Sequence, residues 1–281
     1  MKYNFSEKIG LGTWRLGESD HTKQNEIKSI EHALSIGYRL IDTAEMYANG
    51  NSELLVGKAL KNIGNSKRDQ FTVVSKVLPS NASASGVVKA CEASLRRLGC
   101  DYLDIYLLHW KGPYSFDQTL EGFQVLKHRG LIKNHGVSNF DIVELNKWSD
   151  AEKSLGLQGS NTLATNQVYY SLSARGIEFD LIPDLTQKEV SLMAYSPLGA
   201  GDLVRNKKLC ELARTLGLTG AQLALAWVIR QPNTVAIPKS VSKTRIEENW
   251  SSKDIVLSKD TLAALDLLFT SPKAKTSLAI L

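Results

Sequence analysis

The sequence of 281 residues has only three cysteines, and none belongs to a Cys-x-x-Cys pair or has a histidine at ligand spacing: Cys91, Cys100 and Cys210. This scarcity argues against a disulfide framework and against a structural zinc site, so we expect no metal. No apolar run is long enough to span a bilayer, and no apolar stretch follows the N-terminal lysine as in a secretory signal. We therefore expect a cytoplasmic protein with no membrane partner.

Charge of one sign is not concentrated anywhere in the chain. The 34 lysines and arginines exceed the 29 acidic residues, but they are spread along the sequence instead of forming a block or an aromatic-interleaved patch. Nucleic acid is therefore not an expected partner, whereas a local cluster could still hold a small anion. The share of hydrophobic residues, 43%, is that of a globular protein with ample material for a core.

Short β-rich runs alternate with helical stretches eight times, which is typical of a (β/α)8 TIM barrel. The predicted strands are Ile9–Trp14, Tyr38–Asp42, Phe71–Lys76, Tyr102–His109, Ile132–Ser138, Thr162–Gln167, Ser191–Tyr195 and Thr234–Pro238. The predicted helices include Glu26–Ile36, Ser52–Asn62, Ser85–Leu98, Thr119–Arg129 and Ala221–Gln231. Two further helices, Lys207–Leu216 and Lys259–Phe269, exceed the count. No linker or low-complexity tract divides the chain, so we predict one barrel domain over residues 1–281 with two additional helices.

Polar or aromatic side chains end every predicted strand, and enzymes with this fold have their active sites at those ends. Asp42, Lys76 and His109 end the second, third and fourth strands, and Tyr47 follows Asp42 by five residues. Neighbouring strand ends lie side by side, so we expect these four groups to converge. Strands often end in polar loops and His109 alone could be a core histidine, but isolated charges at a barrel mouth must be paired or solvated.

The four groups suit proton transfer to a carbonyl oxygen. A tyrosine has an ordinary pKa of about 10. We expect the Lys76 cation to lower the pKa of Tyr47, with Asp42 keeping the lysine charged, so that the phenol becomes a general acid. His109 could donate to the same oxygen. No unpaired nucleophile for the carbonyl carbon stands out, and hydride from a nicotinamide would complete the reaction.

The remaining strand ends suit a nicotinamide cofactor. Groups that can pair with a carboxamide end two of them: Ser138, Asn139 and Gln167. Tyr195 offers an aromatic face for stacking. Lys239, Lys243 and Arg245 come together at the head of the last barrel helix, where a phosphate would also meet free backbone amides. This cluster favours a phosphorylated ribose.

The sequence resembles the aldo-keto reductase superfamily, and its bacterial aldehyde and ketone reductases in particular, along essentially the whole chain. Eight fragments in order carry the resemblance: "GLGTW", "GYRLIDTAEMY", "SKVLPSN", "DYLDIYLLHW", "GVSNF", "NQVYY", "AYSPLG" and "AIPKSVSKTRIEEN". One such fragment would be weak evidence, but eight at the expected strand ends are specific. The resemblance implies NADPH (NADP+) bound across the barrel mouth without a Rossmann domain, so the absence of a Gly-x-Gly-x-x-Gly fingerprint is then expected.

The resemblance also implies a role for each site residue. Tyr47 would be the catalytic acid/base, with Asp42, Lys76 and His109 as its partners, and Trp14 and Trp110 would shape the substrate pocket. The implied cofactor-binding residues are Thr13; Ser138, Asn139 and Gln167 at the carboxamide; Tyr195 on the nicotinamide ring; Ser196 and Leu198 at the pyrophosphate; Lys239, Ser240 and Arg245 at the 2′-phosphate; and Glu248 and Asn249 at the adenine.

Three stretches depart from the family pattern. "YANGNSE" replaces a shorter turn behind Tyr47, and the segment before "GLGTW" has room for little more than one strand of the usual barrel-plugging hairpin. The segment "TSPKAKTSLAIL" after the last helix is too short for the long substrate loop of animal members. We therefore expect an open pocket with loose selectivity for small aldehydes, ketones or dicarbonyls.

Other functions compete with an NADPH-dependent oxidoreductase acting as a monomer. A Schiff-base aldolase would also keep a lysine such as Lys76 at a strand end. An NADPH-binding sensor or subunit of a larger assembly would keep the cofactor with little turnover, and a crystallin-like protein would use none of these groups. The complete catalytic set favours the reductase, because fold alone does not decide function.

Overall fold

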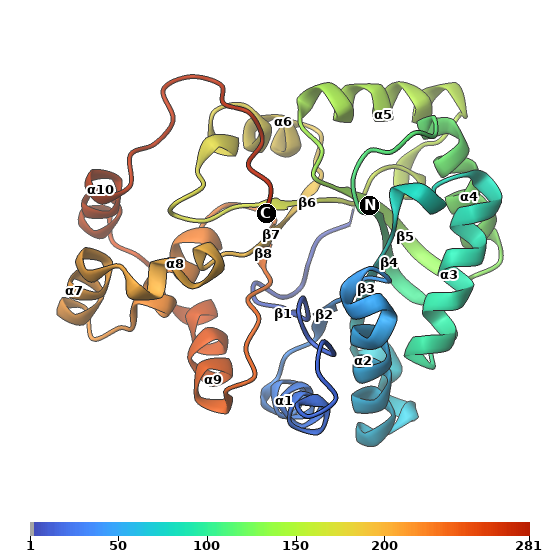
Figure 1. Ribbon diagram of the computed structural model, residues 1–281. Coiled ribbons are helices and arrows are strands. Elements are labelled where there is room, and N and C mark those ends of the chain that lie inside the picture. The colour runs from blue at the N-terminus through green and yellow to red at the C-terminus, as the bar shows by residue number, and fades with distance from the viewer. Residues whose placement is uncertain (1–2) are drawn as a thin grey trace.

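The computed structural model describes residues 3–281, without the side chains of residues 65–67 and 160. Its eight parallel strands form one sheet in chain order, at the centre of Figure 1, with helices around them. The strands are β1 (Leu11–Gly12), β2 (Leu40–Asp42), β3 (Thr72–Val77), β4 (Leu103–Leu108), β5 (Ile132–Ser138), β6 (Thr165–Tyr169), β7 (Ser191–Tyr195) and β8 (Thr234–Ala236). The helices are α1 (Lys23–Ile36), α2 (Asn51–Ile63), α3 (Ala84–Leu98), α4 (Phe116–His128), α5 (Ile142–Ser154), α6 (Leu181–Gln187), α7 (Lys207–Thr215), α8 (Gly220–Val228), α9 (Lys243–Ser251) and α10 (Lys259–Leu268). The (β/α)8 architecture with additional helices is as predicted.

The first and last strands close the barrel through a few irregular hydrogen bonds. Ile9 forms a parallel bridge with Ala236, and the Gly10 N–H donates to the Ala236 carbonyl at 2.8 Å. The Gly12 N–H then donates to the carbonyl of Pro238 at 3.1 Å. Both strands are shorter than predicted, and for β8 the reason is Pro238, which has no N–H with which to extend the ladder.

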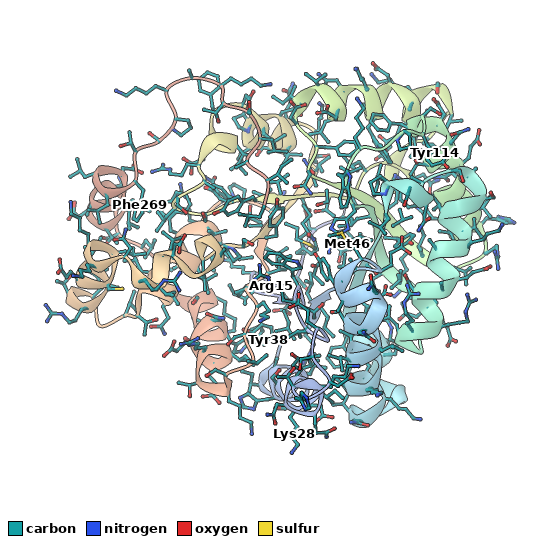
Figure 2. All side chains as sticks on the ribbon, in the orientation of Figure 1. Arg15, Lys28, Tyr38, Met46, Tyr114 and Phe269 are labelled. Atoms are coloured by element: carbon teal, nitrogen blue, oxygen red, sulfur yellow. The ribbon has the colours of Figure 1, made fainter. Side chains whose placement is uncertain are left out.

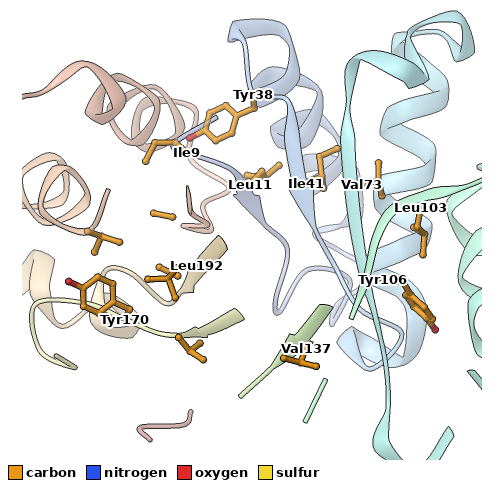
Figure 3. Packing of buried hydrophobic residues seen from close by; sticks show 14 of the residues in the cluster. Ile9, Leu11, Tyr38, Ile41, Val73, Leu103, Tyr106, Val137, Tyr170 and Leu192 are labelled. Atoms are coloured by element: carbon orange, nitrogen blue, oxygen red, sulfur yellow. The ribbon is translucent and has the colours of Figure 1, made fainter. Parts of the chain in front are cut away.

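Two apolar layers hold the strands. The outer layer lies between strands and helices, and Figure 3 shows part of it: Ile9, Leu11, Ile41, Val73, Leu103, Tyr106, Val137 and Leu192. The inner layer fills the barrel with Leu40, Val74, Ile105, Leu107, Met193, Val235 and Ile237. Side chains alternate between the two faces of a strand, so Asp42 and Lys76 continue the inner layer two residues beyond Leu40 and Val74.

The N-terminal segment contributes aromatic side chains to the inner layer. Tyr3 and Phe5 pack against it, and their two rings contact each other edge to face with centroids 5.1 Å apart. The Ser191 hydroxyl donates to the Tyr3 carbonyl at 2.7 Å and fastens this segment to the start of β7. Residues 3–8 form no strand. The rings of Tyr3 and Phe5 therefore pack against the inner layer from an irregular segment, where we had expected one strand.

Several helices begin directly after a capping side chain. Ser83 accepts from the Gly86 N–H at the start of α3, and Asp141 forms a capping box with Glu144 at the start of α5. The additional helices α7 and α10 lie outside the ring beside α8 (Figure 1) and begin at the predicted residues. Helices α5 and α6 were not among the predicted ranges, although the Asp141 box is a signal for the first. No helix in residues 3–281 is both long and apolar enough to cross a bilayer.

Helix α2 lies against α3 where a glycine allows close approach. A Cβ at Gly57 would lie 2.6 Å from the Leu98 carbonyl oxygen and 2.8 Å from that of Arg97. Neither oxygen can move without displacing the end of α3. Although alanine is favoured over glycine in a helix by about 1 kcal/mol, this contact outweighs that preference.

We expect Gly57→Ala to lower the free energy of unfolding by about 1–3 kcal/mol, the usual cost of overpacking. Urea denaturation would measure the change. The control is Lys58→Ala on the exposed face of α2, which should remain within about 0.5 kcal/mol of the wild type. A Gly57→Ala protein as stable as the control would contradict the close contact.

Candidate active site

The four predicted catalytic residues converge inside the barrel mouth. The Lys76 ammonium lies 2.8 Å from both carboxylate oxygens of Asp42 and 3.1 Å from the Tyr47 hydroxyl. It also donates to the Thr43 carbonyl at 2.8 Å. His109 contacts Tyr47 edge to face, with ring centroids 5.7 Å apart. All four side chains are buried.

Burial and pairing act in opposite directions on the central ion pair. Burial raises the pKa of Asp42 and lowers the pKa of Lys76, because each group loses water around its charged form. Their mutual attraction and hydrogen bonds oppose both shifts. Since Asp42, the Thr43 carbonyl and the Tyr47 hydroxyl each accept a hydrogen bond from the Lys76 ammonium, the lysine has no free amine for attack on a carbonyl, which disfavours the aldolase alternative.

The pKa of Tyr47 differs from our expectation. Burial raises it well above the ordinary value, and the Asp42 carboxylate raises it further. We had expected Lys76 to lower this pKa, which is wrong for this site because Asp42 offsets the lysine charge at 2.8 Å. The phenol therefore keeps its proton in the ligand-free site, where it can serve as a donor.

His109 is a neutral imidazole at the edge of the cluster. Burial, with the nearby Lys76 cation, lowers the pKa of His109 to about 2. Its ring packs against Trp110 with centroids 4.8 Å apart. The buried His109 Nδ1 has no hydrogen-bond partner among the described residues. A buried polar atom without a partner is costly, so this side chain fits a site that a ligand completes.

The turn after β2 holds Tyr47 over the ion pair. Residues Tyr47–Gly50 form a short 3-10 turn in which Ala48, Asn49 and Gly50 have φ values of 48°, 53° and 84°. Three successive left-handed residues accommodate the longer "YANGNSE" sequence before α2 begins. Such a conformation is costly for Ala48, so the surrounding contacts must hold the turn in place.

The predicted carboxamide-binding residues form a network on β5, β6 and β7. The Tyr195 hydroxyl donates to Asn139 Oδ1 at 2.9 Å, and Asn139 Nδ2 donates to the His109 carbonyl at 3.2 Å. Ser138 donates to the Gln167 carbonyl at 2.8 Å. The Gln167 amide nitrogen donates to Asp42 Oδ1 at 2.7 Å, which connects this network to the ion pair. One face of Tyr195 stacks on Tyr169, and the roles of these residues toward a cofactor stay predictions.

The predicted phosphate-binding residues lie around the start of α9. Lys239, Lys243 and Arg245 are exposed, and within residues 3–281 none of them forms an ion pair. Ser240 accepts from the Ser242 N–H at 3.2 Å, while Ser242, the N-cap of α9, makes no side-chain cap. A helix start with free amides and three nearby cations suits a phosphate.

The other predicted contacts are distributed along the mouth. Thr13 is buried and donates to the Asp42 carbonyl at 2.9 Å, whereas Ser196, with a φ of 46°, and Leu198 precede the turn at Gly199–Gly201. In α9, Glu248 is half-buried and Asn249 is buried.

The two predicted pocket tryptophans stand at the rim. Trp14 and Trp110 are each 38% exposed, so neither is a plain core aromatic. The Arg15 guanidinium lies 4.6 Å from the centre of the Trp14 ring. In Figure 2, Arg15 lies within the ring of helices, in contrast to Lys28 at its outer edge.

The C-terminal segment returns toward the site. After α10 it crosses the molecule and ends beside β7 (Figure 1). Lys275 lies 3.2 Å from Asp180, and Leu278 packs against the outer core. Burial raises the pKa of Tyr195 to about 12, and the Leu281 backbone lies close enough to its hydroxyl to oppose that shift. A short segment thus reaches the nicotinamide end of the predicted site, and no local sequence signal shows where it lies.

Comparisons with known proteins place this geometry in context. A model of the Aldo/keto reductase family matches residues 8–268. The chain is 41% identical to methylglyoxal reductase YeaE of Escherichia coli over 275 residues, which cover 96% of this chain and 93% of the relative. A crystal structure of an aldo-keto reductase from Klebsiella pneumoniae in complex with NADPH superposes with a TM-score of 0.91 at 39% identity, covering 100% of both chains. A second from Klebsiella pneumoniae, with NADP and acetate, has a TM-score of 0.90 at 41% identity and covers 98% of this chain and 95% of its own.

The depressed pKa of His109 gives a pH-dependent stability. The folded state binds no proton there until about pH 2, whereas the unfolded histidine titrates near its ordinary 6.5. This stabilisation is complete above pH 6.5 and is lost as the pH falls toward 2. We expect wild type to lose about 2 kcal/mol more than His109→Gln between about pH 7 and pH 5, at about 1.4 kcal/mol per pH unit below the unfolded pKa. Urea denaturation at both pH values tests this, and equal losses in the two proteins would disprove a neutral His109.

Proposed function

Because the chain belongs to the aldo/keto reductase family, we propose that it reduces small aldehydes, ketones or dicarbonyls to alcohols with NADPH. The hydrogen-bonded cluster of Tyr47, Lys76 and Asp42 beside a neutral His109 is the observation that carries this proposal. Two relatives from Escherichia coli are methylglyoxal reductases, YeaE and DkgB, so methylglyoxal is the first substrate to test.

The residues around the mouth fit the cofactor. The hydroxyl and amide groups of Ser138 and Asn139 would hold its carboxamide, with the Gln167 amide beside them, and the free face of Tyr195 would receive its ring. Lys239 and Arg245 would meet the 2′-phosphate. When bound, NADPH supplies the hydride that attacks the carbonyl carbon.

Tyr47 and His109 would bind the carbonyl oxygen and supply the proton. The substrate oxygen accepts hydrogen bonds from the Tyr47 hydroxyl and from His109, which polarises the carbonyl. As negative charge develops on that oxygen, the Tyr47 proton moves to it. The Lys76 ammonium, 3.1 Å from the phenol oxygen, then stabilises the phenolate that remains. Trp14 and Trp110 flank the approach to this oxygen.

We also propose that the whole chain forms one catalytic barrel, which works as a monomer in the cytoplasm. Size-exclusion chromatography with light scattering would test the monomer, and cell fractionation would test the location.

Tyr47→Phe should lower kcat by about 10² to 10⁴, the usual contribution of a positioned acid, and leave NADPH affinity nearly unchanged. Consumption of NADPH with methylglyoxal and aromatic aldehydes measures the first quantity, and fluorescence titration measures the second. Wild-type turnover by the variant would remove Tyr47 from its role. Tight NADPH binding by the wild type with no turnover on any carbonyl would favour the sensor or subunit.

The double variant Lys239→Ala, Arg245→Ala should weaken NADPH binding by about 10- to 100-fold, the value of lost charge-assisted hydrogen bonds, and affect NADH much less. Dissociation constants for both cofactors test the difference. Lys259→Ala, at the start of α10, removes a lysine from a similar helix position and serves as the control. Equal losses for the two cofactors would contradict the 2′-phosphate assignment.

A further inference from the structure

A partly buried ion pair lies on the outer side of β3, behind the active site, with the Arg97 side chain 26% exposed. The Glu53 carboxylate is fully buried in the first turn of α2. It accepts a hydrogen bond from Arg97 Nε at 2.5 Å and another from the Ser75 hydroxyl at 2.5 Å. Ser75 precedes Lys76 in β3, and Arg97 is in the last turn of α3. The Glu53 carboxylate therefore joins α2, α3 and the strand that carries the catalytic lysine.

The same ion pair supports the strained turn that carries Tyr47. A Cβ on Gly50 would lie 2.7 Å from both Cδ and Nε of Arg97, so the arginine side chain packs directly against the turn. Glu53 follows this turn within one helical turn. Removing the ion pair would release the outer support of a left-handed segment that is costly to hold.

A second set of contacts fixes the inner side of the helix start. The Ser52 hydroxyl donates to Thr13 Oγ1 at 2.8 Å, and the Thr43 hydroxyl donates to Ser52 at 3.2 Å. Thr13 in turn donates to the Asp42 carbonyl at 2.9 Å. The two residues that begin α2 after the turn are thus held on opposite sides, Ser52 by Thr13 and Thr43 and Glu53 by Ser75 and Arg97.

We propose that the Glu53–Arg97 ion pair is a positioning device for the catalytic acid: it fixes the start of α2 and the turn Ala48–Gly50 so that the Tyr47 hydroxyl stays within hydrogen-bond distance of Lys76. Glu53 and Arg97 act through the turn and touch neither substrate nor cofactor. The inference rests on the proposed function for its kinetic part, whereas its structural part concerns Tyr47 in the ligand-free protein. Burial lowers the pKa of Lys76, and the Glu53 charge opposes this shift in addition to the larger effect of Asp42.

The test compares Glu53→Gln, which removes the charge with little change of shape, with Arg97→Lys, which keeps the charge but loses the planar guanidinium. We expect Glu53→Gln to lower kcat for methylglyoxal by about 10- to 100-fold, part of the effect of a positioned acid. NADPH affinity and KM should stay within about twofold, and the isotope effect with 4-deuterated NADPH should rise as chemistry becomes rate-limiting. Arg97→Lys should lower kcat less than Glu53→Gln does, because it keeps the positive charge.

The matched control is Asp104→Asn. Asp104 accepts from Arg68 at 2.8 Å and from Lys133 at 2.9 Å, near the opposite end of the strands. It should lose stability in urea comparably to Glu53→Gln but keep its kcat. If Glu53→Gln keeps the wild-type kcat, or if Asp104→Asn loses as much activity for the same loss of stability, the ion pair has a general structural role and the proposal fails.

A readout independent of turnover separates this inference from the proposed function. The ring resonances of Tyr47, assigned in the ligand-free protein by comparison with Tyr47→Phe, report its position beside Lys76. We expect Glu53→Gln to shift or broaden them and Asp104→Asn to leave them unchanged. Unshifted resonances overturn the positioning role, even if activity falls. If the wild type reduces no carbonyl, the proposed function fails but this inference does not, because the Tyr47 resonances can still be compared between the variants. If Glu53→Gln does not fold, Arg97→Lys and Ser75→Ala carry the same comparison.

Discussion

The site depends on one buried cation. Lys76 cannot remain charged inside the barrel without Asp42, and Asp42 cannot lose its water without the lysine. This mutual requirement brings the ends of β2 and β3 together, and Gln167 connects the same carboxylate to β6 across the mouth. Burial raises the pKa of Tyr47 and lowers the pKa of His109, and the ion pair adds to both shifts, through Asp42 for the first and Lys76 for the second. The proposed chemistry depends on Lys76 being paired with Asp42 and on Tyr47 and His109 lying beside this pair.

Much of this arrangement could be predicted from the sequence because strand ends in a barrel are neighbours in space. The positions of Asp42, Lys76 and His109 after apolar runs were enough to bring them together. Period-two alternation then placed Asp42 and Lys76 on the inner face, above Leu40 and Val74. The helix starts were predictable to within a few residues where a capping side chain was present.

The sequence did not predict features that depend on distant contacts. The pKa of Tyr47 was predicted in the wrong direction, since its sign depends on how closely Asp42 offsets Lys76 and on complete burial. The ion pair of Glu53 with Arg97 joins residues 44 positions apart, and neither residue belongs to a strand end. The path of the C-terminal segment to Tyr195 likewise rests on isolated contacts, such as that of Lys275 with Asp180, that leave no periodic pattern.

The left-handed turn before α2 has a consequence for how such a protein can change. Ala48 occupies a backbone region where glycine would relieve strain, so selection for thermal stability alone would favour glycine there. A glycine would also widen the range of conformations open to the neighbouring phenol, at the point where small displacements slow proton transfer. Thermal stability therefore favours glycine at position 48, whereas precise positioning of the Tyr47 phenol favours alanine. A more stable variant of this protein would have to gain its stability elsewhere in the barrel.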